Sequence, residues 1–374
     1  MNHQHHILHF LKNRELDELY ISMALRSFAV SMIAVFIPIF LLQLGFSLVD
    51  VLIYYITVNL THALFVIPAA KISTKYGIKH IIYLSNPLLI IFLILLFSLE
   101  MYSWPLILLG IIRGLNKGLF WVGYHTDFSK FSNRKQRGEQ VGISKVLVAV
   151  ASTIGPVFGG ILITLTSFQT VFITVSILLL ISALPLFLSK EIHQPTNFSL
   201  KQLFGSQKLK DGLAYAGHGV STGVGYFLWP IFIFFNILND YTALGAVTTL
   251  TFFLALLFTM VIAKLVNTNR KLILRLGVIL DAVIWGIKFY VSAAFQVFII
   301  DSFYGIAKTT TELPLDAISY DKANRDGNVI RHIMFREIMI QVGRTVLFIA
   351  MIFIADLTFS FAFAGAGSLL MLLF

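Results

Sequence analysis

Long stretches of this chain contain neither lysine nor arginine, and this pattern limits the possible folds more than any other feature. No basic residue lies between Arg26 and Lys71, between Lys145 and Lys190, or between Lys210 and Lys264. An apolar helix needs about 20 residues to cross a bilayer, so each stretch is long enough for two crossings. Basic residues return only at every second turn, as in the cytoplasmic loops of membrane proteins. The chain is therefore predicted to be an all-α membrane protein that crosses the bilayer many times.

The composition agrees with a chain that lies mostly in lipid. Of its 374 residues, 57% are hydrophobic and 12% are charged, and the mean hydropathy is +0.85. The net charge of +10 resides in short loops, where it fixes topology, so a nucleic-acid partner is not expected. The absence of cysteine excludes disulfides and thiolate metal sites. No cleavable signal peptide is expected, because a polar N-terminus is followed by an apolar run of full spanning length.

Hydropathy predicts twelve membrane-spanning helices, at about residues 18–44, 48–70, 80–99, 104–127, 141–164, 168–189, 212–236, 242–265, 272–292, 295–319, 331–354 and 358–374. With the tail of about residues 1–17 in the cytoplasm, every cytoplasmic loop contains lysine or arginine. The charged side chains of the outer loops are then all acidic: Asp50, Glu100, Asp240 and Asp356. This asymmetry predicts a multi-pass protein of the plasma (inner) membrane with a cytoplasmic N-terminus. The last span ends at Phe374 without a basic tail, which is typical of a chain truncated at its C-terminus.

A polar segment divides the predicted spans into two sets of six. Residues 190–211 contain four lysines together with proline, asparagine, serine and glutamine. This composition predicts a cytoplasmic linker between an N-terminal bundle, residues 1–189, and a C-terminal bundle, residues 212–374.

Two loops repeat the same spacing. Asp127 and Gly138 stand 11 residues apart after the fourth span, and Asp316 and Gly327 stand 11 residues apart after the tenth. The two pairs are offset by 189 positions, about half of the chain. The sequence therefore predicts two pseudo-symmetric six-helix bundles, the arrangement of transporters built from repeats. We expect these four loop residues to help close the cytoplasmic face.

Three short motifs resemble those of the major facilitator superfamily. Residues 70–79 read AKISTKYGIK, similar to the family's Gly-x-x-x-Asp-Arg-x-Gly-Arg-Arg loop, with threonine in place of the aspartate and with three family positions kept, Lys75, Gly77 and Lys79. The fifth span contains a match to the Gly-Pro-x-x-Gly-Gly signature of the drug/proton antiporter branch, in Gly155, Pro156, Gly159 and Gly160. The fourth span contains a looser echo of the Arg-x-x-Gln-Gly pattern, in Arg113, Asn116 and Gly118. The resemblance covers the whole chain and implies a secondary transporter of twelve spans.

These motifs have structural as well as functional interpretations. Glycines in the fifth span allow a neighbouring helix to approach closely, and Pro156 bends the span. The motif can therefore serve close packing alone or a role in gating, and both interpretations stay open. Gly77 is expected to end a helix or turn the loop, while Lys75 and Lys79 suit topology as well as a conformational switch.

Charged side chains inside the spans mark a candidate site, because each costs on the order of 3 kcal/mol or more at mid-depth unless it is paired or faces water. The fourth span presents Arg113, Lys117, Trp121 and Tyr124 on one stripe. In the tenth span Lys308 and Glu312 have the i,i+4 spacing that permits pairing. The family resemblance implies that spans one, four, seven and ten line a central cavity. The candidate substrate and coupling residues are therefore Arg26, Arg113, Lys117, Trp121, Tyr124, His218, Lys308 and Glu312.

Two interpretations of this charged set stay open. In the first it binds substrate and couples transport to protons, with Glu312 titrating and the excess of cations favouring an anionic ligand. In the second, Lys308 and Glu312 form a structural pair, while Arg26 and Asp127 orient helix ends at the membrane interface. No metal site is expected, because the histidines of the tail have no carboxylate nearby.

The sequence thus predicts a secondary active transporter that moves a small solute through alternating access, most simply by proton-coupled efflux. The excess of cations in the spans favours an anionic solute. We expect a monomer that is not an enzyme and that uses no cofactor except the proton as a coupling ion. Two alternatives stay open: uptake or exchange of an organic anion by the same fold, and a non-transporting or lipid-translocating membrane protein.

Overall fold

The computed structural model describes residues 14–131, 137–187, 209–325, 329–354 and 356–374, and every regular element in these ranges is helical. The N-terminal half contains α2 (Arg14–Ala34), α3 (Ile37–Gln43), α4 (Leu48–Tyr76), α5 (Ile78–Phe97), α6 (Leu106–Phe131), α7 (Arg137–Leu165), α8 (Phe168–Ala183) and η1 (Leu184–Phe187). The C-terminal half contains α10 (Leu209–Gly223), η2 (Val224–Leu228), α11 (Trp229–Ile233), η3 (Phe234–Leu238), α12 (Tyr241–Lys288), α13 (Ala294–Arg325), α14 (Val329–Ile354), α15 (Phe359–Leu370) and η4 (Met371–Leu373). The predicted linker falls largely outside the described residues.

Each predicted span corresponds to a helical segment whose ends differ by a few residues from the expected ones. Eight helices of the described part are long and apolar enough to cross a membrane, and two shorter apolar helices lie at Phe168–Ala183 and Phe359–Leu373. The remaining two spans, the second part of α12 and α13, are less apolar because they contain several charged side chains, among them Asp281, Lys288, Asp301, Lys308 and Glu312. The twelve-span architecture is confirmed.

Proline and asparagine interrupt several of the spans. The first span is broken between α2 and α3, where Pro38 lies in the first turn of α3. The seventh passes through two π-helical turns, and Pro230 begins the short α11 between them. A loop of several residues was expected between spans eight and nine; the label α12 covers both spans, two helices that meet at a kink at Asn269, which has a non-helical conformation. The Asn269 side chain accepts a hydrogen bond from the Leu272 amide at 3.1 Å and so caps the helix that follows.

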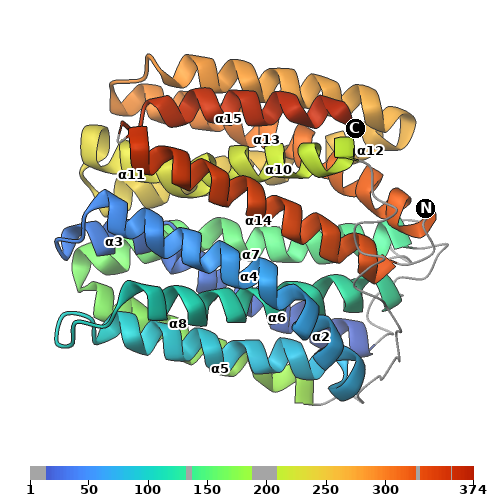
Figure 1. The fold of residues 1–374 in the computed structure, drawn as a ribbon, viewed down its shortest axis with the longest axis horizontal. Coiled ribbons are helices and arrows are strands. Elements are labelled where there is room, and N and C mark those ends of the chain that lie inside the picture. Colours follow the sequence, from blue (N-terminus) through green and yellow to red (C-terminus); the bar gives the residue numbers. More distant parts are fainter. Residues whose placement is uncertain (1–13, 132–136, 188–208, 326–328, 355) are drawn as a thin grey trace, which may run out of the picture.

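The two halves of the chain form two helical bundles that lie side by side (Figure 1). In the N-terminal bundle α2 packs on α7 and α8, and α6 packs on α4 and α5. In the C-terminal bundle α10 packs on α14 and α15, and α12 packs on α13. Across the interface α4 contacts α14, and α7 contacts α12. Any solute path between the bundles is therefore bounded by these two helix pairs.

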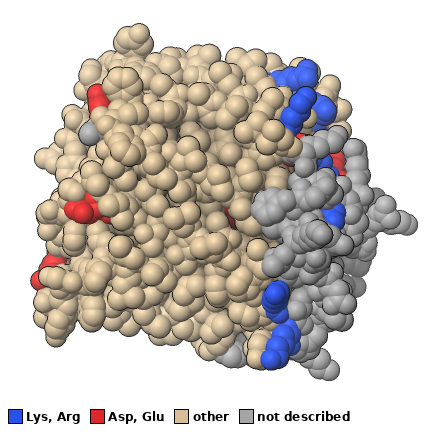
Figure 2. Space-filling model, viewed as in Figure 1, with Lys and Arg blue, Asp and Glu red and all other residues tan. Residues whose placement is uncertain are grey.

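Charges separate to opposite ends of the molecule (Figure 2). Figure 2 shows acidic side chains at one end, here called the acidic end, and lysine and arginine at the other, the basic end. The predicted outer loops contain the acidic residues, and exposed cations such as Lys71, Lys264 and Lys271 lie in or beside the predicted cytoplasmic loops. Between them the visible face is almost free of charge, and large apolar side chains such as Leu64, Ile177 and Val346 are exposed. A surface of this kind is suited to lipid rather than to water.

The two bundles touch at the acidic end through aromatic and hydroxyl side chains. Tyr241, the first residue of α12, donates a hydrogen bond to Gln43 and packs edge to face against Phe36 and Phe168 of the N-terminal bundle. Beside it, the hydroxyls of Thr164 and Thr242 are 3.0 Å apart. The described conformation is therefore closed between α7 and α12 at this end.

Candidate functional site

Arg26 and Arg113 belong to a buried polar network inside the N-terminal bundle. Arg26 of α2 donates a hydrogen bond to the side-chain oxygen of Asn86 in α5, and its guanidinium lies 4.1 Å from the Phe120 ring centroid. Arg113 donates to Asn116 one turn along α6, and Asn116 in turn donates to the Ser85 carbonyl at 2.6 Å. The network joins α2, α5 and α6. The hydrogen-bond acceptors that it offers to the two guanidinium groups are neutral asparagine side chains.

Few carboxylates lie close in sequence to these cations. Between residues 20 and 125 the sequence contains only two acidic residues, Asp50 and Glu100, and both belong to the predicted outer loops. Within this segment Arg26, Arg113 and Lys117 therefore have no acidic partner at membrane depth. Since an unpaired cation at mid-depth costs several kcal/mol, this arrangement requires a counter-charge.

Lys117 meets that counter-charge across the bundle interface. Its ammonium interacts electrostatically with Arg113 on its own helix and with Arg344 and Glu337 of α14. Glu337 is only 6% exposed, and its Oε2 lies 3.7 Å from His62 Nε2 of α4. Side chains from α4, α6 and α14 thus meet at the boundary between the bundles. Of the two α14 side chains that interact with Lys117, Glu337 is acidic and Arg344 is basic.

The C-terminal bundle contributes a second set of charges to the same region. Lys308 of α13 lies with its ammonium 4.0 Å from the Tyr226 ring centroid, and it interacts electrostatically with Tyr226 and Glu312. Arg344 interacts with Glu312 as well as with Glu337, and its guanidinium donates to the Thr222 hydroxyl at 3.0 Å. We call the set formed by Arg113, Lys117, Lys308, Glu312, Glu337 and Arg344 the central cluster.

The remaining predicted substrate residues surround the central cluster or the N-terminal network. His218 of α10 is buried, one turn before Thr222, and it interacts electrostatically with Arg344 and Lys308. Trp121 and Tyr124 pack against each other, with their ring centroids 5.8 Å apart, and Tyr124 stacks on Phe120. Both aromatic residues therefore lie near Phe120, the ring that Arg26 contacts.

The glycines of the fifth span fit α7 between two neighbours. A side-chain carbon at Gly159 would lie 1.8 Å from the Met32 carbonyl of α2, and one at Gly160 would lie 2.3 Å from the Tyr241 carbonyl of α12. Gly155 likewise faces Ser31 and Phe28 of α2. Gly245 of α12 approaches the Pro156 carbonyl from the other side. The motif therefore provides close packing both within the N-terminal bundle and at the bundle interface.

Other predicted gating residues take up varied positions. Gly77 ends α4 with a φ of +98°, a conformation that favours glycine, and Lys75 is exposed beside Tyr76. Asp316 accepts a hydrogen bond from Arg336 at 2.7 Å, a link between α13 and α14. Lys79, Asp127 and Gly138 lie in α5, α6 and α7, and their surroundings fall outside the described part, as does Gly327.

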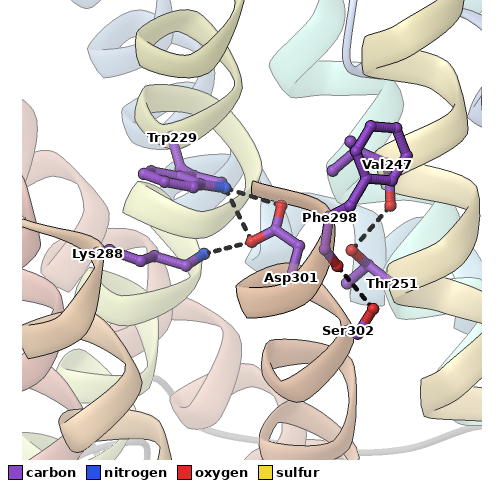
Figure 3. A network of polar contacts seen from close by, with 7 residues as sticks. All are labelled: Trp229, Val247, Thr251, Lys288, Phe298, Asp301 and Ser302. Carbon is purple, nitrogen blue, oxygen red and sulfur yellow. Dashed lines mark hydrogen bonds and ion pairs between the residues drawn. The ribbon is translucent and has the colours of Figure 1, made fainter. Parts of the chain in front are cut away.

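Two groups of buried polar residues were not among the predicted site residues. Glu337 and His62 join the bundles, and an acidic residue within the predicted eleventh span was the signal for the first of them. In the C-terminal bundle the Lys288 ammonium lies 2.8 Å from an Asp301 oxygen, and the Trp229 indole donates to both carboxylate oxygens, at 2.9 and 3.0 Å (Figure 3). Lys288 also interacts electrostatically with Asp281 and with Lys308 of the central cluster.

Comparisons with known proteins agree on one family. The model of the Major Facilitator Superfamily matches residues 19–214, which is more than half of the chain. An uncharacterised protein of Bacillus subtilis (strain 168), YqgE, is 23% identical over 350 residues, which cover 89% of this chain and 81% of the relative.

A solved structure gives the same fold. The crystal structure of the Major Facilitator Superfamily transporter FucP in the outward conformation matches with a TM-score of 0.70 at 14% identity and covers 96% of both chains. The fold is that of secondary transporters, which act by alternating access of two bundles and are not enzymes. With its twelve spans, two bundles and interface charges, this chain belongs to the Major Facilitator Superfamily.

Proposed function

We propose that this protein transports a small anionic solute by alternating access and binds it at the central cluster. One observation carries this proposal: the cluster has more cations than carboxylates. The cluster contains the cations Arg113, Lys117, Lys308 and Arg344 and the carboxylates Glu312 and Glu337, and Lys308 also interacts with Asp281. With Asp281 counted, the formal charge of four cations and three carboxylates is about +1, and a bound anion would neutralise it.

The position of the cluster supports a role in transport. Lys117 belongs to the N-terminal bundle, whereas Arg344 and Lys308 belong to the C-terminal bundle. A solute bound between them contacts both moving parts, as alternating access requires. Buried ionisable groups in membrane proteins generally mark substrate or ion pathways, because each is costly in lipid.

Proton coupling follows from the two carboxylates of the cluster. Protonation of Glu312 or Glu337 would remove a negative charge and so increase the attraction of the site for an anion. Proton and anion then bind cooperatively, which favours uptake with protons or exchange of anions. The fifth-span motif of Gly155, Pro156, Gly159 and Gly160 supports a second candidate, efflux in exchange for protons, through its resemblance to the antiporter branch. In that case proton and solute compete, and the solute binds more weakly at lower pH.

The proposed topology places the basic end in the cytoplasm and the acidic end outside, in the plasma membrane. The charge separation in Figure 2 supports it, because lysine and arginine accumulate on the cytoplasmic side of membrane proteins. In this orientation the described contact between α7 and α12 closes the outer face. We propose a monomer, since each chain supplies both bundles of the transport unit.

The test is thermal stabilisation of the purified protein by a panel of small organic anions and of lipophilic cations at two pH values. A ligand that binds the folded state at about 100 times its dissociation constant stabilises it by roughly 2.7 kcal/mol. We expect stabilisation by an anion, its loss in Lys117→Gln, and its retention in the control Lys271→Gln, which removes an exposed cation of the basic end.

Glu312→Gln then separates the two coupling schemes. If protons and anion bind cooperatively, the anion stabilises the wild type more strongly at the lower pH, and this pH dependence becomes smaller in the variant. Weaker binding at the lower pH would favour efflux in exchange for protons. Stabilisation by cations that is unaffected by Lys117→Gln and by Glu312→Gln would contradict the proposed anion site.

A further inference from the structure

The contact between α4 and α14 contains buried polar groups that the central cluster does not use. Tyr55 and His62 of α4 face α14, since Tyr55 packs on Phe348 with ring centroids 5.7 Å apart and His62 lies 3.7 Å from Glu337. Asn59 stands four residues after Tyr55 and three before His62, so it lies on the same helical stripe. Asn59 therefore faces α14 between these two contacts.

Asn59 is buried without a hydrogen-bond partner. It is 1% exposed, and neither its side-chain nitrogen nor its oxygen has a partner among the residues that the structure describes. On the opposite helix Thr345 is 7% exposed, and its hydroxyl also lacks a partner. Thr345 lies three residues before Phe348, on the same helical stripe as the contact with Tyr55, and directly after Arg344. Two unsatisfied polar side chains thus lie in the contact between α4 and α14.

Such groups are costly unless something binds them. A buried donor or acceptor without a partner costs about 1–3 kcal/mol, and the surrounding lipid offers no hydrogen bonds to replace it. If these positions served packing alone, leucine in place of Asn59 and valine in place of Thr345 would fill a similar volume without burying polar atoms. Thr345 directly follows Arg344 of the central cluster, and Asn59 lies one helical turn before His62, which is 3.7 Å from Glu337 of the cluster. They are therefore placed to bind a solute whose charge lies at the cluster.

We propose that Asn59 and Thr345 form a hydrogen-bonding subsite for the uncharged part of the anionic solute. The inference depends on the proposed anion transport and adds a substrate class to it. Asn59 offers two donors and one acceptor, and Thr345 offers one donor and accepts in turn. A partner that uses all of them must donate as well as accept, as hydroxyl groups do. The substrate is therefore a hydroxylated organic anion and not an aliphatic one.

The experiment compares matched anions that differ only in hydroxyl groups. Gluconate and glycerate are compared with hexanoate and propionate, which have the same chain lengths and one carboxylate each, by thermal stabilisation of the full-length protein. We expect a hydroxylated anion to stabilise the wild type at about 10- to 100-fold lower concentration than its aliphatic counterpart, because a site that hydrogen-bonds a hydroxyl rejects the analogue without it. In Asn59→Leu and in Thr345→Val this preference should largely disappear.

The outcomes separate the inference from the proposal on which it rests. Equal or better stabilisation by the aliphatic anions, lost in Lys117→Gln, would overturn the hydroxylated substrate and keep the anion site. Stabilisation by neither series would contradict both. A preference for the hydroxylated anions that persists unchanged in Asn59→Leu and Thr345→Val would overturn the assignment of the subsite to these residues.

Stability without ligand gives a second readout. Because Asn59 has no partner, Asn59→Leu should leave the melting temperature unchanged or raise it. The matched control is Asn86→Leu, another buried asparagine, which accepts from Arg26 and donates to Ser182 and to the Leu179 carbonyl. That variant should melt at a lower temperature. A comparable decrease in Asn59→Leu would show that the Asn59 amide is structural and would overturn the subsite.

Discussion

At the scale of single residues, burial decides what each charge inside this protein can do. Lys288 is completely buried, and its ammonium lies about equally close to three aromatic rings, 4.1 Å from Trp229, 4.4 Å from Trp285 and 4.0 Å from Tyr304. Its ion pair with Asp301 supplies the opposite charge. In contrast to the central cluster, this pair is internally neutral and lies within one bundle. We therefore interpret it as a structural element of the C-terminal bundle.

Removing one partner of this pair should be severely destabilising. In Asp301→Asn the Lys288 charge stays buried without compensation, which costs about 3–5 kcal/mol. The double variant Lys288→Met, Asp301→Asn removes the charge as well and should recover much of this loss. The measurement is thermal unfolding of the detergent-purified single and double variants. A melting temperature of Asp301→Asn equal to that of the wild type would contradict this role.

At the scale of helices, close approach depends on the absence of side chains at a few positions. Gly160 of α7 lets the backbone of α12 pass at the acidic end, where a side-chain carbon would lie 2.3 Å from the Tyr241 carbonyl. Gly286 of α12 is different, since no atom lies within 4 Å of the corresponding position. Substituting each of these glycines by alanine therefore separates the effect of helix packing on stability from the effect of helix propensity.

Gly160→Ala should force α7 and α12 apart and destabilise the closed acidic end by about 1–3 kcal/mol, the usual cost of overpacking. Gly286→Ala should have no such cost and should stabilise its helix by about 0.5–1 kcal/mol, because alanine loses less backbone entropy than glycine. Melting temperatures of both variants check the difference. If the two substitutions had the same effect, the steric role of Gly160 would be wrong.

At the scale of the whole molecule, alternating access requires that the contact between α7 and α12 open during transport. The natural chain has no cysteine, so paired cysteines can be introduced without removing any. Thr164 and Thr242 are suitable positions, since their hydroxyls are 3.0 Å apart across the bundle interface. A bond between them would hold the acidic end closed.

The variant Thr164→Cys, Thr242→Cys should form a disulfide under oxidation, and transport should stop until a reductant restores it. In the proposed orientation these residues lie outside, so a membrane-impermeant reductant added to intact cells should be sufficient. The single variants are the controls and should transport normally. Full transport by the oxidised double variant would contradict opening at this interface, and a requirement for a permeant reductant would reverse the topology.

The sequence alone determined the positions of the spans, because the signal is local. A run of about 20 apolar residues must be helical in lipid, since no water is present to bind its backbone groups. Gly77 was placed correctly at a helix end for a similar reason, because its conformation depends on its immediate neighbours. The break expected between the eighth and ninth spans is present at Asn269, but the connection is shorter than expected, since both helices extend to this residue.

The tertiary structure decided which charges meet. Lys117 and Lys308 were identifiable from composition, but the proximity of Glu337 and Arg344 depends on which faces of α6 and α14 point toward the interface. The same is true of Arg26, whose bond to Asn86 keeps it within the N-terminal bundle. Sequence fixes where a charge lies along its own helix, because that depends only on spacing. The rotation of each helix about its axis follows from packing against all its neighbours, and so the site emerges only in the folded molecule.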